Sequence, residues 1–221
     1  MVRFSGPRLW ISGALWICAL VVTAPVSLPL PAAAQSAAPA EVADAPAPPT
    51  TRLELPGVPN AGKVSEFLYR GGRPSAAGLA KLKELGVMMV IDLDNGGGRE
   101  KERKAVEGLE LRYVNIPLSG WYSPPAGSVA SFLELVRANR DRKIFVHCRF
   151  GSDRTSVMMA VHRIAQQKWT VEQALSEMHT FRFHAHWHFN LIKYVRRFPA
   201  LYAADPAFAA LRSQTDAHPS Q

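Results

Sequence analysis

The stretch VHCRFGSDRTS, residues 146–156, holds residue types at a spacing that suits phosphate chemistry. Cys148 offers a sulfur nucleophile, Arg154 follows six positions later, and Gly151 lies between them. A loop of backbone N–H groups that opens into a helix N-terminus binds anions, because these donors are unpaired and the helix dipole adds positive potential. The same field, with the charge of Arg154, is expected to favour the thiolate of Cys148. The spacing therefore predicts a phosphoryl-binding loop beside a reactive sulfur.

Strand and helix patterns alternate around this loop. Three apolar runs have the length of buried strands: VMMVIDL (87–93), LRYVNIP (111–117) and KIFVHC (143–148). Three segments repeat apolar residues at helical spacing: 129–136, 154–167 and 171–178, the last preceded by a capping-box pair, Thr170 and Gln173. This alternation predicts an α/β fold, a three-layer domain with a central, mostly parallel sheet flanked by helices. The phosphate-binding loop is expected between a strand and a helix, where open α/β sheets bind ligands.

The N-terminus has the pattern of a secretory signal peptide. Two arginines precede an apolar run, and small residues offer a cleavage site after Ala34. The expected division is a signal peptide at 1–34, an Ala/Pro-rich linker at 35–51, the folded domain at 52–200 and a C-terminal tail at 201–221. The protein would be exported, to the periplasm or outside the cell, with Cys148 as its remaining cysteine. An uncleaved membrane anchor is the alternative, since residues 9–30 almost span a bilayer.

The charge balance limits the classes of partner. With 26 Lys and Arg against 18 Asp and Glu, the formal net charge is +8. A basic surface favours phosphorylated ligands, anionic membranes or nucleic acid. The chain has no clustered basic run with interleaved aromatics, so a nucleic-acid partner is not expected. Membrane contact is expected only if the signal peptide stays uncleaved.

The residues His147-Cys148, five further residues and Arg154-Thr155 resemble the signature of cysteine-dependent protein tyrosine and dual-specificity phosphatases. The resemblance extends from about residue 53 to residue 199, and LYRGGRPS (68–75) resembles the opening of the small atypical branch found in bacteria, plants and fungi. It implies that Cys148 attacks phosphorus and carries a phosphocysteine intermediate. Arg154 would bind two phosphoryl oxygens, Thr155 would hydrogen-bond the departing sulfur, and His147 would order the loop from beneath.

Further side chains are candidates for contact with substrate. Within the loop these are Arg149, Phe150, Gly151 and Ser152, which are expected to offer mainly backbone N–H groups. Arg70 and Arg73 are candidates for binding further phosphates, with exposed salt bridges as the alternative. Trp121, next to Tyr122, is expected either to wall the substrate cleft or to pack under a loop.

The resemblance predicts an exported phosphomonoesterase that needs no metal and no cofactor. Phosphorylated proteins are the leading substrate class, and inositol phosphates or phosphoinositides are the alternative within the same chemistry. A phosphate-binding pseudophosphatase is a third interpretation, because the loop IPLSGWYSPP (116–125) lacks the aspartate with which this family usually protonates the leaving group.

The source of that proton is the open question of the sequence. The candidates are Asp153, Asp92, Asp94, Glu100, Glu102 and solvent. Asp153 is the best placed, and the CxxGxDR form resembles loops of myotubularin-like lipid phosphatases and of some secreted bacterial tyrosine phosphatases, which use an in-loop aspartate. Against this assignment, Arg154 next to it favours the ionised carboxylate. Asp153 would then serve only to fix the arginine.

Four histidines between residues 179 and 188 raise the alternative of a metal site. His184 and His188 have the i, i+4 spacing of a zinc pair on one helix face. That face would also carry Leu191, Ile192 and Val195, so a packed His188 is the expected outcome, and no metal is predicted. The segment also resembles the FRFH-like stretch that follows the signature helix in related bacterial phosphatases.

Overall fold

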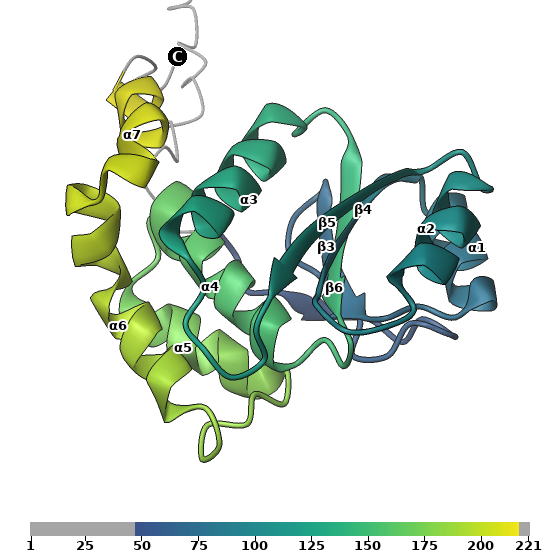
Figure 1. Ribbon diagram of the computed structural model, residues 1–221, viewed down its shortest axis with the longest axis horizontal. Helices are drawn as coiled ribbons and strands as arrows, with labels where there is room; N and C mark the ends of the chain where they lie inside the picture. Colours follow the sequence, from purple (N-terminus) through teal and green to yellow (C-terminus); the bar gives the residue numbers. More distant parts are fainter. Residues whose placement is uncertain (1–46, 217–221) are drawn as a thin grey trace, which may run out of the picture. The chain divides into compact units, whose positions relative to one another are not determined.

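A six-stranded sheet carries the fold (Figure 1). The computed structural model describes residues 47–216. The expected signal peptide and most of the expected linker lie outside the described residues, as do residues 217–221. Within the described part, no helix combines the length and the apolar character that crossing a membrane requires.

The sheet is mostly parallel, with the strand order β1-β2-β3-β6-β4-β5. The strands are Thr51–Arg52 (β1), Gly62–Lys63 (β2), Leu68–Gly72 (β3), Val87–Asp94 (β4), Arg112–Leu118 (β5) and Lys143–Cys148 (β6). β3, β6, β4 and β5 run parallel, whereas β1 and β2 pair antiparallel at one edge. β4 and β6 are almost entirely buried, because their apolar runs face helices on both sides.

Helices cover both faces of the sheet (Figure 1). α1 (Ala76–Glu84) and α2 (Arg99–Glu107) lie on one face. α3 (Ala126–Ala138), α4 (Asp153–Gln166), α5 (Val171–Thr180) and α6 (Phe189–Ala204) form the other layer. Successive strand residues point to opposite faces, so Phe145 packs with the first layer and Val146 with the second. The structure thus confirms the predicted three-layer α/β domain.

The parallel register brings the functional segments to one edge of the sheet. Gly72 of β3 is paired with Cys148 of β6, and Asp94 of β4 is paired with Leu118 of β5. The carboxyl ends of these four strands therefore meet. The loops that follow them carry Arg73, residues 95–98, residues 119–125 and the expected phosphate-binding loop.

The connection between α5 and α6 differs from the sequence expectation. α5 begins with the predicted capping box, in which the N–H of Gln173 donates to Thr170 Oγ1 at 3.2 Å and the N–H of Thr170 to Gln173 Oε1 at 2.8 Å. Arg182 then has a φ of 59°, in the left-handed region that interrupts a helix, and α6 starts only at Phe189. The expected shared helix face of His184 and His188 is therefore wrong.

Packed residues continue past both expected boundaries of the domain. On the N-terminal side, the indole N–H of Trp169 donates to the Ala47 carbonyl at 2.8 Å, and Thr50 accepts a hydrogen bond from Arg163 at 2.9 Å. On the C-terminal side, η1 (Pro206–Phe208) and α7 (Ala209–Asp216) follow α6. Phe208 is completely buried in the main core. The structure thus extends the packed body beyond residues 52–200, because apolar residues in the Ala-rich end fill space beside α3 and α6.

Candidate active site

The predicted phosphate-binding loop joins β6 to α4. Cys148 ends β6, and α4 begins at Asp153. Cys148 is a free thiol with only 2% of its surface exposed, so its sulfur is shielded from bulk solvent. The first turn of a helix leaves its backbone N–H groups without helical partners. The loop therefore presents unpaired donors directly above a buried nucleophile.

Gly151 is required where the loop turns. Its φ is +71°, and a Cβ built there would lie 2.3–2.5 Å from backbone atoms of Gly71 and Gly72. Gly72 is equally close to the loop, since a Cβ on it would meet the Phe150 carbonyl carbon at 2.9 Å. The loop thus packs backbone against backbone on β3. This contact explains Gly72 of the LYRGG strand, whereas a Cβ on Gly71 would meet the side chains of Phe145 and Val58 at 2.9–3.0 Å.

Hydrogen bonds from beneath fix the direction of the loop peptides. The Gly151 carbonyl accepts from Arg70 Nη2 at 2.7 Å and from Asn60 Nδ2 at 2.9 Å. A trans peptide holds its C=O and the following N–H on opposite sides. The N–H of Ser152 therefore points away from Arg70 and toward the concave side of the loop, where an anion binds.

The next peptides of the loop follow the same pattern. The Arg149 carbonyl accepts from the N–H of Arg73 at 3.3 Å, which turns the N–H of Phe150 to the opposite side. The side chains of Arg149 and Phe150 are exposed, and the guanidinium lies 5.4 Å from the ring centre. Both residues therefore suit the predicted contribution of backbone donors.

Arg70 does not reach the substrate side, which corrects the expectation from the sequence. It is 1% exposed, donates to Ser156 Oγ at 2.9 Å as well as to Gly151, and stacks on Phe181 at 3.9 Å. Burial lowers the pKa of Arg70 to about 9, although the charges of Glu177 and Cys148 act in the opposite direction. The guanidinium therefore stays charged at neutral pH and supports the loop from below.

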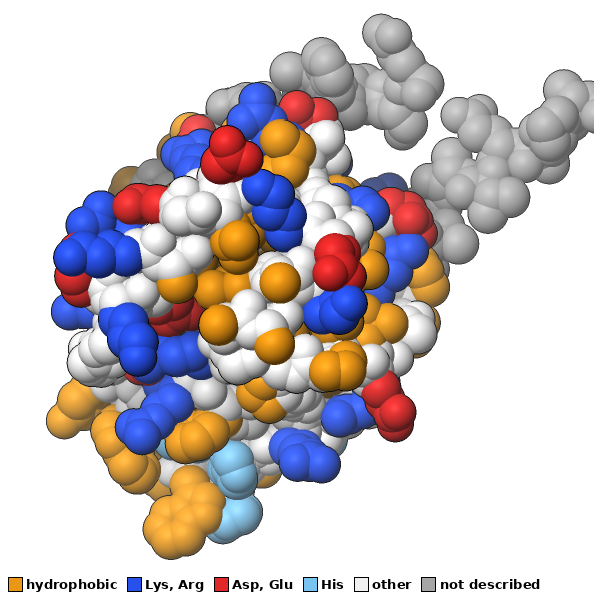
Figure 2. All heavy atoms as spheres, turned by 90° about the vertical axis from the view of Figure 1, so that its right-hand side faces the viewer, with side chains coloured by type: hydrophobic (Ala, Val, Ile, Leu, Met, Phe, Trp, Pro, Cys, Tyr) orange, Lys and Arg blue, Asp and Glu red, His pale blue; other side chains and the backbone are white. Residues whose placement is uncertain are grey.

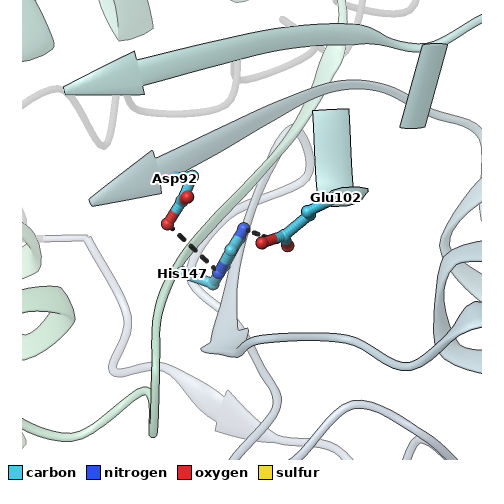
Figure 3. Close-up of side chains that lie close together, drawn as sticks. All are labelled: Asp92, Glu102 and His147. Atoms are coloured by element: carbon cyan, nitrogen blue, oxygen red, sulfur yellow. Dashed lines mark ion pairs between the residues drawn. The ribbon is translucent and has the colours of Figure 1, made fainter. Parts of the chain in front are cut away.

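His147 lies between two buried carboxylates, as Figure 3 shows. Its Nε2 is 3.1 Å from Glu102 of α2, and its Nδ1 is 3.8 Å from Asp92 of β4. Asp92 also accepts from the Tyr113 hydroxyl at 2.8 Å and from the N–H of Asp94 at 2.8 Å. These contacts fix His147 directly before Cys148, and its role in ordering the loop from beneath stays a prediction.

Arg73 belongs to the same buried network and not to the substrate side. It contacts Glu102 at 2.8 Å and Asp94 at 3.0 Å. Among residues 47–216, the group that could hold a metal ion is Asp92, Glu102 and His147. Because Tyr113 and Arg73 already contact its carboxylates, and Arg73 adds a positive charge, we interpret this group as an internal ion-pair network.

Arg154 lies at the end of this network, where it contacts Asp94. Its Nη1 donates to Asp94 Oδ1 at 2.6 Å, to Asn95 at 3.2 Å and to the Leu118 carbonyl at 3.3 Å. Nε and Nη2, the edge expected to bind two phosphoryl oxygens, have no partner among the described residues. Burial alone would raise the pKa of Asp94, but the hydrogen bond and charge of Arg154, the Gly96 amide and Arg73 together lower it.

Thr155 completes the loop from the helix side. It is fully buried, and its Oγ1 has no hydrogen-bond partner within the described part of the chain. A buried hydroxyl without a partner is costly, by about 1–3 kcal/mol. The proposed hydrogen bond to the sulfur would satisfy it.

The structure separates the candidates for the general acid. Asp94 is held ionised by Arg154, and the exposed Glu100 has its pKa lowered by its hydrogen bond to Arg103. Asp92 and Glu102 lie in the network beneath the loop. These four are poorly placed to protonate a leaving group, which leaves Asp153 and solvent.

Asp153 contacts the histidine segment, which the sequence did not reveal. It accepts from the backbone N–H of His184 at 3.0 Å, and His184 Nδ1 lies 3.1 Å from each of its carboxylate oxygens. His188 Nε2 is 3.8 Å from Oδ2. Ser152 Oγ donates to Asp153 at 3.3 Å. No local pattern predicts these contacts, because they join α4 to residues about thirty positions later.

Trp121 lies in the loop that lacks the family's usual acid. Its side chain is 66% exposed, and its ring centre is 5.4 Å from that of His188. Asn190 Nδ2 donates to its carbonyl at 2.7 Å. The side chain therefore stands at the mouth of the site and does not pack under the loop.

Comparison with known proteins agrees with this geometry. Residues 59–188, more than half of the chain, match the protein family described as DSP-PTPase phosphatase fused to NAD+ kinase. The chain belongs to this family. The match confirms the cysteine-dependent phosphatase family expected from the HCx5RT signature.

Individual relatives are more distant. The chain is 30% identical over 119 residues to the dual specificity protein phosphatase TpbA of Pseudomonas aeruginosa, covering 54% of this chain and 53% of that protein. It is 25% identical over 122 residues to the inositol diphosphatase DSP3 of Arabidopsis thaliana, covering 53% and 60%. The chain thus spans about half the length of the first curated relatives it matches. The crystal structure of P. aeruginosa TpbA superposes with a TM-score of 0.60 at 26% identity, over 70% of this chain and 94% of that one.

The contact between the loop and β3 generates a prediction. Gly151→Ala is expected to lower turnover and vanadate affinity by about 10²-fold or more, because the added Cβ pushes the loop off β3 and misdirects its donors. Gly127→Ala in α3 is the matched control, since a Cβ there meets nothing within 4 Å. Thermal unfolding of both variants separates loss of the site from loss of the fold. Wild-type vanadate affinity in Gly151→Ala would contradict the prediction.

Proposed function

We propose that the protein is an exported phosphomonoesterase that works through a phosphocysteine intermediate. The Cys148 thiolate attacks phosphorus, the P–O bond to the leaving group breaks, and that oxygen takes up a proton. Water then cleaves the S–P bond and releases phosphate. The observation that carries the proposal is the directed loop: amides turned inward over a buried cysteine, with the open edge of Arg154 beside them.

The proton is proposed to come from the pair Asp153–His184. The carboxylate fixes the ring through Nδ1, which leaves Nε2 as the nitrogen that exchanges a proton with the leaving group. Arg154 follows Asp153 in α4, and His188 Nε2 lies 3.8 Å from Asp153 Oδ2. Asp153 begins α4, directly after the loop that follows Cys148, and this placement supports the assignment.

Phosphorylated proteins are the leading proposed substrates, and inositol phosphates or phosphoinositides are the alternative. Both classes are named for relatives, a dual specificity protein phosphatase and an inositol diphosphatase. The exposed Arg149 in the loop favours substrates with additional negative charge. The alternative of a binding protein without turnover rests on the absence of an acid in residues 119–125.

Cys148→Ser tests the intermediate. The variant is expected to release no phosphate from phosphotyrosine peptides or inositol phosphates while still binding them, because serine keeps the loop but removes the thiolate. Phosphate release and calorimetric binding are the measurements, with addition of a chelator as the control for metal. Binding without turnover by the wild type as well would establish the pseudophosphatase.

A series of leaving groups tests the acid. Asp153→Asn and His184→Gln are each expected to slow phosphotyrosine and alkyl phosphates by about 10²-fold and activated aryl phosphates little, because only poor leaving groups need a proton. His179→Gln, which changes an exposed histidine of α5 outside the Asp153 contacts, is the control. Equal slowing of all leaving groups would make the pair structural.

Export is tested on protein recovered from its own cells. Mass spectrometry is expected to show an N-terminus near Gln35, because signal peptidases cleave after small residues such as Ala34. An intact N-terminus in the membrane fraction would instead identify residues 9–30 as an anchor.

A further inference from the structure

Exposed aromatic side chains lie on the catalytic loop and on two segments next to it. The described residues have six exposed large hydrophobic side chains, and five of them belong to three segments beside the loop. These five, which we call the aromatic rim, are Trp121, Tyr122, Phe150, Trp187 and Phe189, each 62–76% exposed. The sixth, Met88, lies at the start of β4, at the opposite end of the strand from the site. This placement relates the rim to the catalytic loop.

Direct contacts hold the three segments together. The Trp121 ring lies beside His188, and Asn190 donates to the Trp121 carbonyl. Asp153 ties the loop that carries Phe150 to His184. The three segments are therefore joined by contacts, although the rim residues are up to 68 positions apart.

The exposed charged side chains next to the rim are mainly positive. Exposed cations accompany the aromatics: Arg149 near Phe150, Lys193 with Nζ 5.6 Å from the Phe189 ring, and Arg182. Residues 119–125, 149–153 and 181–193 contain a single acid, Asp153, which is engaged by His184. Figure 2 shows histidines at the lower edge of one face, with hydrophobic side chains and Lys or Arg on either side. The rim is thus both apolar and cationic.

The rim residue Tyr122 lines a small hollow beside Arg154, and four larger hollows of the described part are lined by other segments. Peptides bind in grooves or pockets that hold individual side chains. Exposed Trp, Tyr and Phe beside Lys and Arg are typical of proteins that lie on anionic membranes.

We propose that the aromatic rim docks on an anionic phospholipid bilayer. Docking brings the catalytic loop to phosphomonoesters in the headgroup layer, so the substrate class is a phosphorylated lipid headgroup. This inference rests on the proposed phosphatase function and narrows its substrate. It also differs from the sequence expectation that membrane contact depends on the N-terminal segment.

Vesicle binding of the full chain tests the surface. Wild type is expected to cosediment with vesicles of phosphatidylglycerol and phosphatidylcholine more than with phosphatidylcholine alone, and less at high salt. The double variant Trp187→Ser/Phe189→Ser is expected to bind the anionic vesicles about 10-fold more weakly or worse, because two inserted rings are lost. Met88→Ser is the matched control and should bind like wild type, because Met88 lies at the opposite end of β4 from the site. All three proteins keep the same N-terminus, so that segment cannot cause a difference between them. Equal binding by all three would overturn the proposal.

Activity separates this inference from the proposed function. The rim variant is expected to hydrolyse a soluble aryl phosphate at the wild-type rate and phosphatidylinositol phosphate in anionic vesicles about 10-fold more slowly. Absence of aryl phosphate hydrolysis in the wild type would contradict the phosphatase function and leave the vesicle result to be judged alone. A variant that binds vesicles normally but has a 10-fold higher KM for a phosphotyrosine peptide would identify the rim as a peptide surface and overturn the proposal.

Discussion

The backbone contact between the catalytic loop and β3 is the constraint on which the site depends. A Cβ at position 72 in the strand, or at position 151 in the loop, would separate the two segments. Because the segments approach closely, Arg70 and Asn60 can donate to the Gly151 carbonyl. These hydrogen bonds fix the orientation of the peptide between Gly151 and Ser152. An anion-binding loop needs its N–H groups to point to one side. Because the C=O and N–H of a trans peptide point in opposite directions, the carbonyls must point to the other side. The strand thus determines the electrostatics of a loop that follows it by almost eighty residues.

A continuous row of contacts between charged and polar side chains leads from this loop into the interior. Arg154 contacts Asp94, Asp94 contacts Arg73, Arg73 contacts Glu102, and Glu102 contacts His147. Buried ion pairs add little net stability, but removing one partner costs about 3–5 kcal/mol because a charge is left uncompensated. The network therefore fixes the positions of Arg154 and His147 relative to each other.

The sequence predicted the parts of this arrangement that are local. Apolar runs identified β4, β5 and β6, and the spacing of Cys148, Gly151 and Arg154 identified the loop, because each signal lies within one element and its adjoining turn. Side-chain environments were harder to predict. Arg70 and Arg73 looked like surface cations, yet one supports the loop and the other lies among three carboxylates, and only the parallel pairing of β3 with β6 reveals this. The break at Arg182 was missed because a left-handed residue interrupts a segment with helical apolar spacing.

The segment without an acid also supplies part of the aromatic rim. Residues 119–125 contain no Asp or Glu but carry Trp121, whose ring packs on His188. The proposed proton source is the pair Asp153–His184, which joins the start of α4 to the 181–188 connection between α5 and α6. That connection also carries Trp187 and ends beside Phe189 at the start of α6. A surface that engages these rings would therefore act on the same short segment that positions His184, so the proposed docking and the proposed protonation would be coupled through one element of the chain.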